Sequence, residues 1–422
     1  MIQIEIPYGK GKMPVHVSAD RLSAVITPEH TELHDADQSA IVRSALEAPI
    51  GTPRLCEMAK DKQRVLIITS DHTRPVPSRI TMPLLLEEVR RGNPDAQITL
   101  LIATGMHRPT TENELRARYG DEIVDKEKIV VHKATVDEDM AFFGILPSGG
   151  ELWLNKLVKE SDLVLSEGFI EPHFFAGFSG GRKSILPGVA SGKTVLYNHN
   201  AQFLQSPHAR QGSLDENPVH KDMLYAAQQA KLAFILNVII DADKRVIAAF
   251  AGDHEKAHRT GCTMCEKMTR VDKVVSDIAI TSNGGYPLDQ NVYQSVKGMT
   301  AAESCVRPNG ALIMCAALGD GHGGEEFYRW FADRPDAAAV TRDIESVPPE
   351  KTHMDQWEAQ ILARVMGKAN CWFVTGEENR ELVETMHLRW APDADTALAE
   401  ATAMLGEQST VTVIPDGVGV IV

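Results

Sequence analysis

Residues 161–200 read SDLVLSEGFIEPHFFAGFSGGRKSILPGVASGKTVLYNHN and combine a buried strand pattern with a glycine-rich loop. The apolar run at 162–168 predicts a strand, and the segment after it predicts a loop that leads into a helix. His173, Lys183 and His199 lie in this passage, together with further basic side chains. A loop that only connects two elements does not need so many histidine and basic side chains, so we expect a functional site here.

The alternation of apolar strands with helical patterns continues on both sides of this stretch. Such alternation is typical of βαβ units, which form parallel sheets with right-handed crossovers. The sequence therefore predicts an α/β fold of two domains with mainly parallel, Rossmann-like sheets and an active site in the cleft between them. Outside the opening stretch, we expect strands at 64–70, 98–104, 128–134, 234–240, 245–251, 277–283, 311–317, 371–376 and 410–415.

A polar connection at residues 266–277 marks the expected domain boundary. At 422 residues the chain exceeds the usual size of a single domain. We expect an N-terminal domain at 1–268, which carries the passage above, and a C-terminal domain at 269–422, which closes the cleft. The final strand can pair in either domain, and the sequence leaves this choice open.

Charge and cysteine content restrict the class of protein. The chain has 43 Lys and Arg residues against 58 Asp and Glu, a net charge of −15 at pH 7. This charge disfavours nucleic-acid and anionic-membrane partners. The sequence also lacks a signal-peptide pattern and an apolar run of the ~20 residues that span a bilayer. Six cysteines without a disulfide-framework spacing are typical of a reducing compartment. We expect a cytoplasmic protein.

Polar side chains follow predicted strands in both halves of the chain. Because ligands bind outside the carboxyl ends of parallel strands, such clusters mark a candidate site. Gly, Pro and Asp also simply form turns, which explains any single cluster equally well. Their recurrence in both predicted domains favours one shared site. The clusters lie at 70–75, 104–109, 167–173, 282–287 and 319–324.

Two segments come close to a phosphate-binding P-loop. GFSGGRKS (177–184) has Arg182 where that motif has glycine, and PGVASGKT (187–194) begins with Pro187. Neither follows directly on a strand, which the motif requires so that backbone N–H groups can hold phosphate. The sequence disfavours a nucleotide triphosphatase, while the loop with Arg182 and Lys183 stays a candidate for binding a single phosphate.

A zinc-protease pattern occurs at HEKAH, residues 254–258. The extended form of this motif has a third histidine at the position of Met264. We interpret His254 and His258 as solvated residues at a helix start, and keep a zinc hydrolase as an alternative. The nearby CxxC has no second pair, so we interpret its cysteines as structural.

Several long segments resemble the nickel-pincer lactate racemase family, and the similarity extends to the C-terminal VTVIPDGVGVIV. The resemblance implies an isomerase that contains nickel held by a pyridinium-3-thioamide-5-thiocarboxylate mononucleotide, attached covalently to a lysine. The segments are SDHTRPVP (70–77), ATGMHRPT (103–110), SEGFIEPHFFAGFSGGRKSILPG (166–188), NGGYPLDQNVYQSVKGMTAAE (283–303) and DGHGGEEFY (320–328).

Carried over to matching positions, the resemblance implies a role for each of ten residues. They are His107 and His173 as the acid/base pair, Lys183 as the cofactor tether, His199 as the nickel ligand, Asp71, Tyr293 and Gln294 beside the cofactor, and Arg74, Lys297 and Trp357 beside the substrate.

These residue types suit the inversion of a 2-hydroxy acid at C2. The C2 hydrogen is weakly acidic, so transient oxidation to the keto acid with hydride transfer to the cofactor is the easier route. The hydroxyl proton needs a base for either enantiomer, which two histidines supply. Arg74 offers a bidentate fork for the carboxylate and Lys297 a point charge.

The sequence predicts a racemase of D- and L-lactate, with three alternatives. The first is a racemase or epimerase of another 2-hydroxy acid on the same cofactor. The second is the zinc hydrolase built on His254 and His258, and the third an inert protein that binds a small acid. Expected partners are the substrate and the proteins that synthesise the cofactor and insert nickel. The sequence leaves open the substrate side chain, the oligomeric state, the cofactor loading, and which histidine serves which enantiomer.

Overall fold

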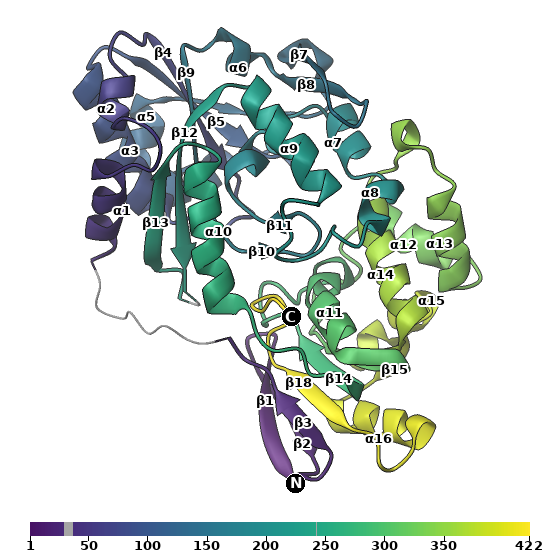
Figure 1. Ribbon diagram of the computed structural model, residues 1–422. Helices are drawn as coiled ribbons and strands as arrows, with labels where there is room; N and C mark the ends of the chain where they lie inside the picture. Colours follow the sequence, from purple (N-terminus) through teal and green to yellow (C-terminus); the bar gives the residue numbers. More distant parts are fainter. Residues whose placement is uncertain (29–36, 242) are drawn as a thin grey trace. The chain divides into compact units, whose positions relative to one another are not determined.

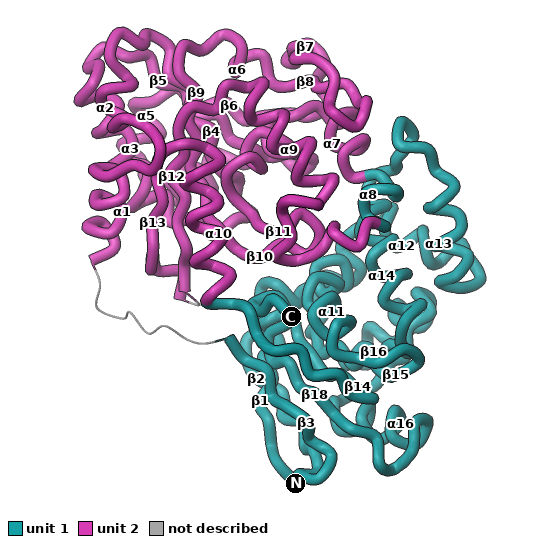
Figure 2. Tube along the Cα trace, viewed as in Figure 1, with its two compact units in different colours: residues 1–30, 200–205, 268–422 teal, residues 31–199, 206–267 magenta. Residues whose placement is uncertain are grey.

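The structure, a computed structural model, describes residues 1–28, 37–241 and 243–422 (Figure 1). The chain divides into two compact units (Figure 2). Unit 1 comprises residues 1–30, 200–205 and 268–422, and unit 2 comprises residues 31–199 and 206–267. The first thirty residues, which the sequence assigned to the N-terminal domain, thus belong with the C-terminal part of the chain.

Unit 2 is built on a six-stranded sheet in the order β13-β12-β9-β4-β5-β6. Every neighbouring pair is parallel except β12 and β13, which are antiparallel. Val65 and Ile67 pack with Leu85 and Val89 in the core of this unit. The strands are β4 (Arg64–Ser70), β5 (Gln97–Ala103), β6 (Lys128–Val131), β9 (Leu163–Phe169), β12 (Leu232–Ile240) and β13 (Val246–Gly252).

Short local signals place the helices of unit 2. Thr111 and Glu114 form a capping box, in which each side chain bonds the backbone N–H of the other residue. Asn217 caps a helix whose first residue is Pro218, where the absent N–H costs nothing. The helices are α1 (Gln38–Glu47), α2 (Leu55–Met58), α3 (Ser78–Gly92), α4 (Glu112–Tyr119), α5 (Asp121–Lys126), α6 (Lys156–Glu160), α7 (Gly192–Asn198), α9 (Pro218–Gln229) and α10 (Lys256–Thr269).

Unit 1 contains a second six-stranded sheet, in the order β17-β16-β15-β14-β18-β3, and all its neighbours are parallel. The final strand β18 pairs with β14 and β3, which answers the question that the sequence left open. The strands are β3 (Leu22–Val25), β14 (Ser276–Ser282), β15 (Val306–Cys315), β16 (Asn370–Val374), β17 (Arg389–Ala391) and β18 (Val411–Ile414).

Helices and an N-terminal hairpin complete unit 1. The hairpin β1 (Ile2–Tyr8) and β2 (Gly11–Val17) contributes Ile6 and Val15 to a core that also contains Ile280 and Ala397. The helices are α8 (Ala201–Gln205), α11 (Val292–Cys305), α12 (Glu325–Ala332), α13 (Ala337–Glu345), α14 (Gln356–Lys368), α15 (Arg380–Thr385) and α16 (Ala394–Leu405).

The predicted α/β class with mainly parallel sheets is confirmed. The sequence missed three hairpins: β1–β2, β7 (Met140–Ile145) with β8 (Glu151–Asn155), and the small β10 (Pro172–His173) with β11 (Gly177–Phe178). Within the described ranges, no helix is long and apolar enough to cross a bilayer.

Candidate active site

Two loops at the carboxyl ends of β4 and β5 bring Asp71 and His107 together. His107 Nδ1 lies 2.7 Å from Asp71 Oδ2, and the Asp71 side chain is 2% exposed while that of His107 is 44% exposed. The other oxygen, Asp71 Oδ1, accepts hydrogen bonds from the backbone and hydroxyl of Thr73. A fixed carboxylate thus orients an accessible imidazole, which is the arrangement of a general acid or base.

Two opposing effects act on the Asp71 carboxyl group. Burial raises its pKa, but the hydrogen bond and the charge of His107, with help from Thr73 and Arg74, outweigh burial and lower the pKa below its usual value. Asp71 is therefore a carboxylate at neutral pH. Its negative charge lies against the imidazole of His107.

A second pair, His173 and Lys183, lies on the loop after β9. Lys183 Nζ is 3.1 Å from His173 Nε2, and the backbone N–H of Ala176 donates to His173 Nδ1 at 3.2 Å. The imidazole stacks on Phe174 and meets the edge of Phe175, with ring centroids 4.9 Å and 4.6 Å apart. These contacts hold the ring in one orientation.

The hydrogen bonds of His173 also restrict its tautomer. A neutral imidazole has one donor and one acceptor nitrogen. Since Nδ1 accepts from Ala176, the proton of neutral His173 lies on Nε2, which faces Lys183 Nζ. His173 Nε2 and Lys183 Nζ thus face each other within hydrogen-bond distance.

His199 ends helix α7 and is 5% exposed. Its Nδ1 donates to the carbonyl of Val195 at 3.0 Å, so the lone pair of the neutral ring lies on Nε2. Burial lowers the pKa of His199 to about 3, and the charge of Lys183 acts in the same direction. The ring is thus neutral, as a metal-ligating histidine must be. Phe175 packs edge-on against it at 5.2 Å between ring centroids.

Arg182, next to Lys183, is buried and turned away from the loop surface. Its guanidinium donates to the carbonyls of Ala176 at 2.6 Å and Phe178 at 2.7 Å, and to His220 Nδ1 at 2.9 Å. Burial lowers its pKa to about 10. These donors are used by the loop carbonyls and by His220 of α9, so the Arg182 side chain is not directed at a phosphate. The residue fixes the loop backbone instead.

Gly180 and Gly181 allow the close approach of this loop to its surroundings. Both have positive φ angles, +78° and +51°. A Cβ on Gly180 would lie 2.7 Å from Asn237 Oδ1, and one on Gly181 would lie 2.7 Å from the His258 ring. The two glycines are therefore required by packing, which the near-miss P-loop interpretation did not anticipate.

His258 is buried, contrary to the solvated helix start predicted for it. It is 2% exposed, and its Nε2 lies 2.8 Å from the carbonyl of Ser179, to which it donates. Burial lowers its pKa to about 3, and the charge of Arg182 adds to this effect. This hydrogen bond occupies the Nε2 that a zinc ion would need. Among the described residues, no group of three His, Cys, Asp or Glu is placed to hold a metal.

The loop that carries His107 is hydrogen-bonded to the loop that carries His173 and Lys183. The N–H of Gly105, two residues before His107, donates to the carbonyl of Gly188 at 3.0 Å. The neighbouring carbonyl of Ala190 accepts from His132 Nε2 at 3.0 Å. The segment that follows Lys183 is thus joined to the ends of β5 and β6, so unit 2 brings the predicted His107 and Lys183 loops together.

Arg74 lies in unit 2, after β4, and unit 1 carries the other four predicted residues on α11 and α14. Lys297 Nζ donates to Gln294 Oε1 at 2.6 Å, and Trp357 Nε1 donates to the hydroxyl of Tyr293 at 3.1 Å. Trp357 is 8% exposed. Burial raises the pKa of Tyr293 well above its usual value. The sequence analysis did not identify Glu358, which is buried on α14 next to Trp357, because a glutamate in a helical pattern is normally exposed to solvent.

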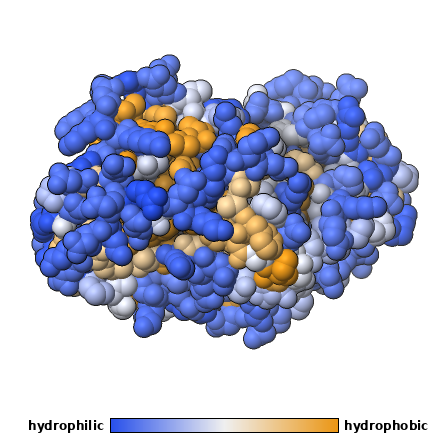
Figure 3. Space-filling view, turned by 90° about the horizontal axis from the view of Figure 1, so that it is seen from above, coloured by the Kyte–Doolittle hydropathy of each residue, from blue (hydrophilic) through white to orange (hydrophobic). Residues whose placement is uncertain are grey.

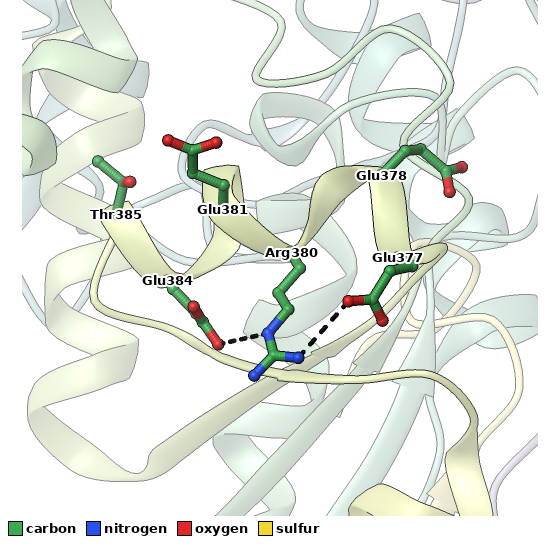
Figure 4. A pocket seen from close by; sticks show the side chains of 6 residues that line it. All are labelled: Glu377, Glu378, Arg380, Glu381, Glu384 and Thr385. Atoms are coloured by element: carbon green, nitrogen blue, oxygen red, sulfur yellow. Dashed lines mark hydrogen bonds and ion pairs between the residues drawn. The ribbon is translucent and has the colours of Figure 1, made fainter.

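Two surface hollows contain none of the predicted site residues. One, of about 670 Å³, is lined in unit 2 by apolar residues such as Phe142 and Val158 with Lys62, Lys159 and Lys231 at its border. Figure 3 looks onto this face and shows apolar side chains gathered among hydrophilic ones. The other, of about 510 Å³, lies along residues 377–385 in unit 1, where Arg380 lies between Glu377 and Glu384 (Figure 4).

Comparison with known proteins shows which family the chain belongs to. Residues 8–212 match the family described as the lactate racemase N-terminal domain, and residues 271–422 match the lactate racemase C-terminal domain. The chain belongs to the lactate racemase family. It is therefore an isomerase, as the sequence predicted.

Two relatives are similar over their full length. A lactate racemase from Thermoanaerobacterium thermosaccharolyticum is 51% identical, covering 100% of this chain and 99% of the relative. One from Lactiplantibacillus plantarum is 48% identical and covers 100% of both chains.

Solved structures extend the comparison. The lactate racemase apoprotein from T. thermosaccharolyticum superposes with a TM-score of 0.97 at 50% identity, over 100% of this chain and 99% of that one. A Thermotoga maritima protein shares the fold, with a TM-score of 0.66 at 17% identity over 91% of this chain and 97% of that one.

Proposed function

We propose that this protein interconverts D- and L-lactate, with His107 and His173 as the acid/base pair and Lys183 as the attachment point of a nickel-pincer nucleotide. The two relatives at about half identity over the whole chain are both named lactate racemase, which supports this substrate. The observation that carries the proposal is the Lys183–His173 contact of 3.1 Å, on a loop hydrogen-bonded to the one that bears His107.

The residues present fit the proposed cofactor. Lys183 contacts the imidazole of His173. Its primary amine can form a thioamide, which the guanidinium of an arginine cannot. His199 is buried and neutral, with its lone pair on Nε2, which suits a single protein ligand for nickel. When bound, the cofactor would accept the hydride from lactate C2 and return it to either face.

The chain's own residues would then handle protons and charge. His107, oriented by the Asp71 carboxylate, would take the hydroxyl proton of one enantiomer. His173 would take that of the other through Nε2, which requires the tautomer with its proton on Nδ1. Arg74, which follows β4, is proposed to hold the substrate carboxylate through its guanidinium fork, with Lys297 as a second cation. The proposal places three further residues beside the cofactor, namely Asp71, Tyr293 and Gln294. It places Trp357 beside the substrate.

Another 2-hydroxy acid remains the alternative substrate, because the same proton and hydride steps apply to any side chain at C2. We also propose a cytoplasmic location, which is supported by cysteines that form no disulfide in the described parts of the chain. The proteins that make the cofactor and insert nickel are the expected partners.

The experiment is to purify the protein from its native host and measure nickel, intact mass and lactate racemisation without added nicotinamide. The proposal predicts about one nickel per chain, a covalent adduct at Lys183 and racemisation. Zinc without an adduct, or an absolute need for soluble nicotinamide, would contradict it.

A further inference from the structure

Glu358 is a buried carboxyl group that no assigned role uses. It lies on α14, is 1% exposed, and neither of its oxygens has a hydrogen-bond partner among the residues that the structure describes. Burying an ionised carboxylate without hydrogen bonds is so unfavourable that the group takes up a proton instead. Burial accordingly raises the pKa of Glu358 to about 8, although the positive charge of Lys297 acts in the opposite direction.

Few charges act on this carboxyl group. They are Lys297, from the packed helix α11, and Asp355, in the turn before α14. Tyr293 of α11 titrates far above neutral pH, and α8 carries no titratable side chain. The charged residues of α12 and α13, such as Glu326 and Arg342, are exposed.

Farther along α14, Arg364 forms an ion pair with Glu303 at 2.7 Å. Lys368 lies beyond it and donates to the Glu303 carbonyl. Neither cation is among the charges that act on Glu358. Lys297 is therefore the cation whose effective charge depends on whether Glu358 is ionised.

We propose that Glu358 is a positioning residue that sets the effective charge of Lys297: its protonated carboxyl leaves the ammonium charge available to a carboxylate ligand, and its ionised carboxylate cancels that charge. This inference rests on the proposed role of Lys297 in substrate binding. Lys297 already donates to Gln294 Oε1 at 2.6 Å, which directs its ammonium group.

Binding of a carboxylate and ionisation of Glu358 then oppose each other. By linkage, each weakens the other to the same extent. As the pH rises through the pKa of Glu358, the affinity for lactate falls, by at most about tenfold per pH unit. The effect belongs to KM and not to kcat, because Glu358 does not exchange protons with the substrate.

The test is to measure KM and kcat for lactate with the cofactor-loaded protein between about pH 6.5 and 9.5, a range that brackets the ionisation. Wild type is compared with Glu358→Gln, which is isosteric and cannot ionise. Glu326→Gln, an exposed substitution of the same kind on α12, is the control. We expect KM to rise on the alkaline side in wild type and Glu326→Gln and to stay level in Glu358→Gln. The same rise in Glu358→Gln, or a change in kcat alone, would overturn the inference.

A second measurement does not require activity. The infrared carbonyl band of a protonated carboxyl should be present in wild type near neutral pH, decrease through about pH 8, and be absent from the difference spectrum of Glu358→Gln. Absence of this band in wild type would sink the inference even if the protein racemises lactate. A band without racemisation would instead reject the proposed function and leave the ionisation of Glu358 established.

Discussion

Neutralising Asp71 should slow racemisation without displacing the imidazole that it contacts. In Asp71→Asn, the amide oxygen can still accept the Nδ1–H of His107 across the present 2.7 Å, so the ring keeps its orientation, while the amide NH2 faces Thr73 and no longer accepts its backbone N–H. What is lost is the negative charge that stabilises the imidazolium formed when His107 takes a proton. The substitution therefore separates charge from geometry.

The size of the effect follows from this contact. A hydrogen bond to a charged group is worth about 1.5–3 kcal/mol, and about 1.4 kcal/mol corresponds to a tenfold change in rate. Burial strengthens the interaction, since the Asp71 side chain is only 2% exposed. We expect kcat to fall by roughly 10- to 150-fold.

The assay is the initial rate in each direction with cofactor-loaded protein. Asp139→Asn is the matched control, because Asp139 pairs with Lys156 at 3.1 Å on the surface, where such pairs contribute little. The control should keep the wild-type rate, and nickel content should match wild type in both variants. A rate for Asp71→Asn within twofold of wild type would refute the charge argument.

Three further predictions concern other residues. Lys183→Arg should lose both the adduct and activity, since a guanidinium cannot form the thioamide. Intact mass measures the adduct, and an adduct retained in this variant would show that the cofactor is attached to another residue. His107→Ala and His173→Ala should each lose activity by at least about 10²-fold while keeping nickel, whereas His199→Ala should lose nickel first; equal nickel loss in all three would reject this division of roles. His258 has a folded-state pKa of about 3, below its ordinary value, so the stability it supports is complete above about pH 6.5 and is lost as the pH falls. The free energy of unfolding, measured with urea between about pH 5 and 6.5, should rise with pH by about 1 kcal/mol per pH unit less in His258→Asn than in wild type. An unchanged slope would contradict the burial argument.

The sequence predicted the main sheets because their strands are long apolar runs. The run at 64–70 became β4 with matching bounds. It did not predict that β3, a four-residue strand with no fully buried residue, would add to β18, because that pairing depends on backbone contacts between distant segments. Residues 1–30 therefore lie with the C-terminal unit.

The site was predicted in part for a similar reason. Turn residues after strands located His107 and the loop with Lys183, since parallel strands end at one edge of a sheet. The environment of a single residue is set by tertiary packing, which spacing does not reveal. His258 was thus expected in solvent but lies buried against Gly181 and Arg182, and Arg182 was expected at a phosphate but holds its own loop.

The most direct test of the proposed reaction follows a label at C2 of lactate. Lactate deuterated at C2 is racemised in ordinary water by the loaded protein, and the deuterium content of the product enantiomer is measured. If hydride leaves C2 and returns to the same carbon, the product keeps its deuterium. Loss of the label to solvent at the rate of racemisation would show proton abstraction at C2 and contradict the account.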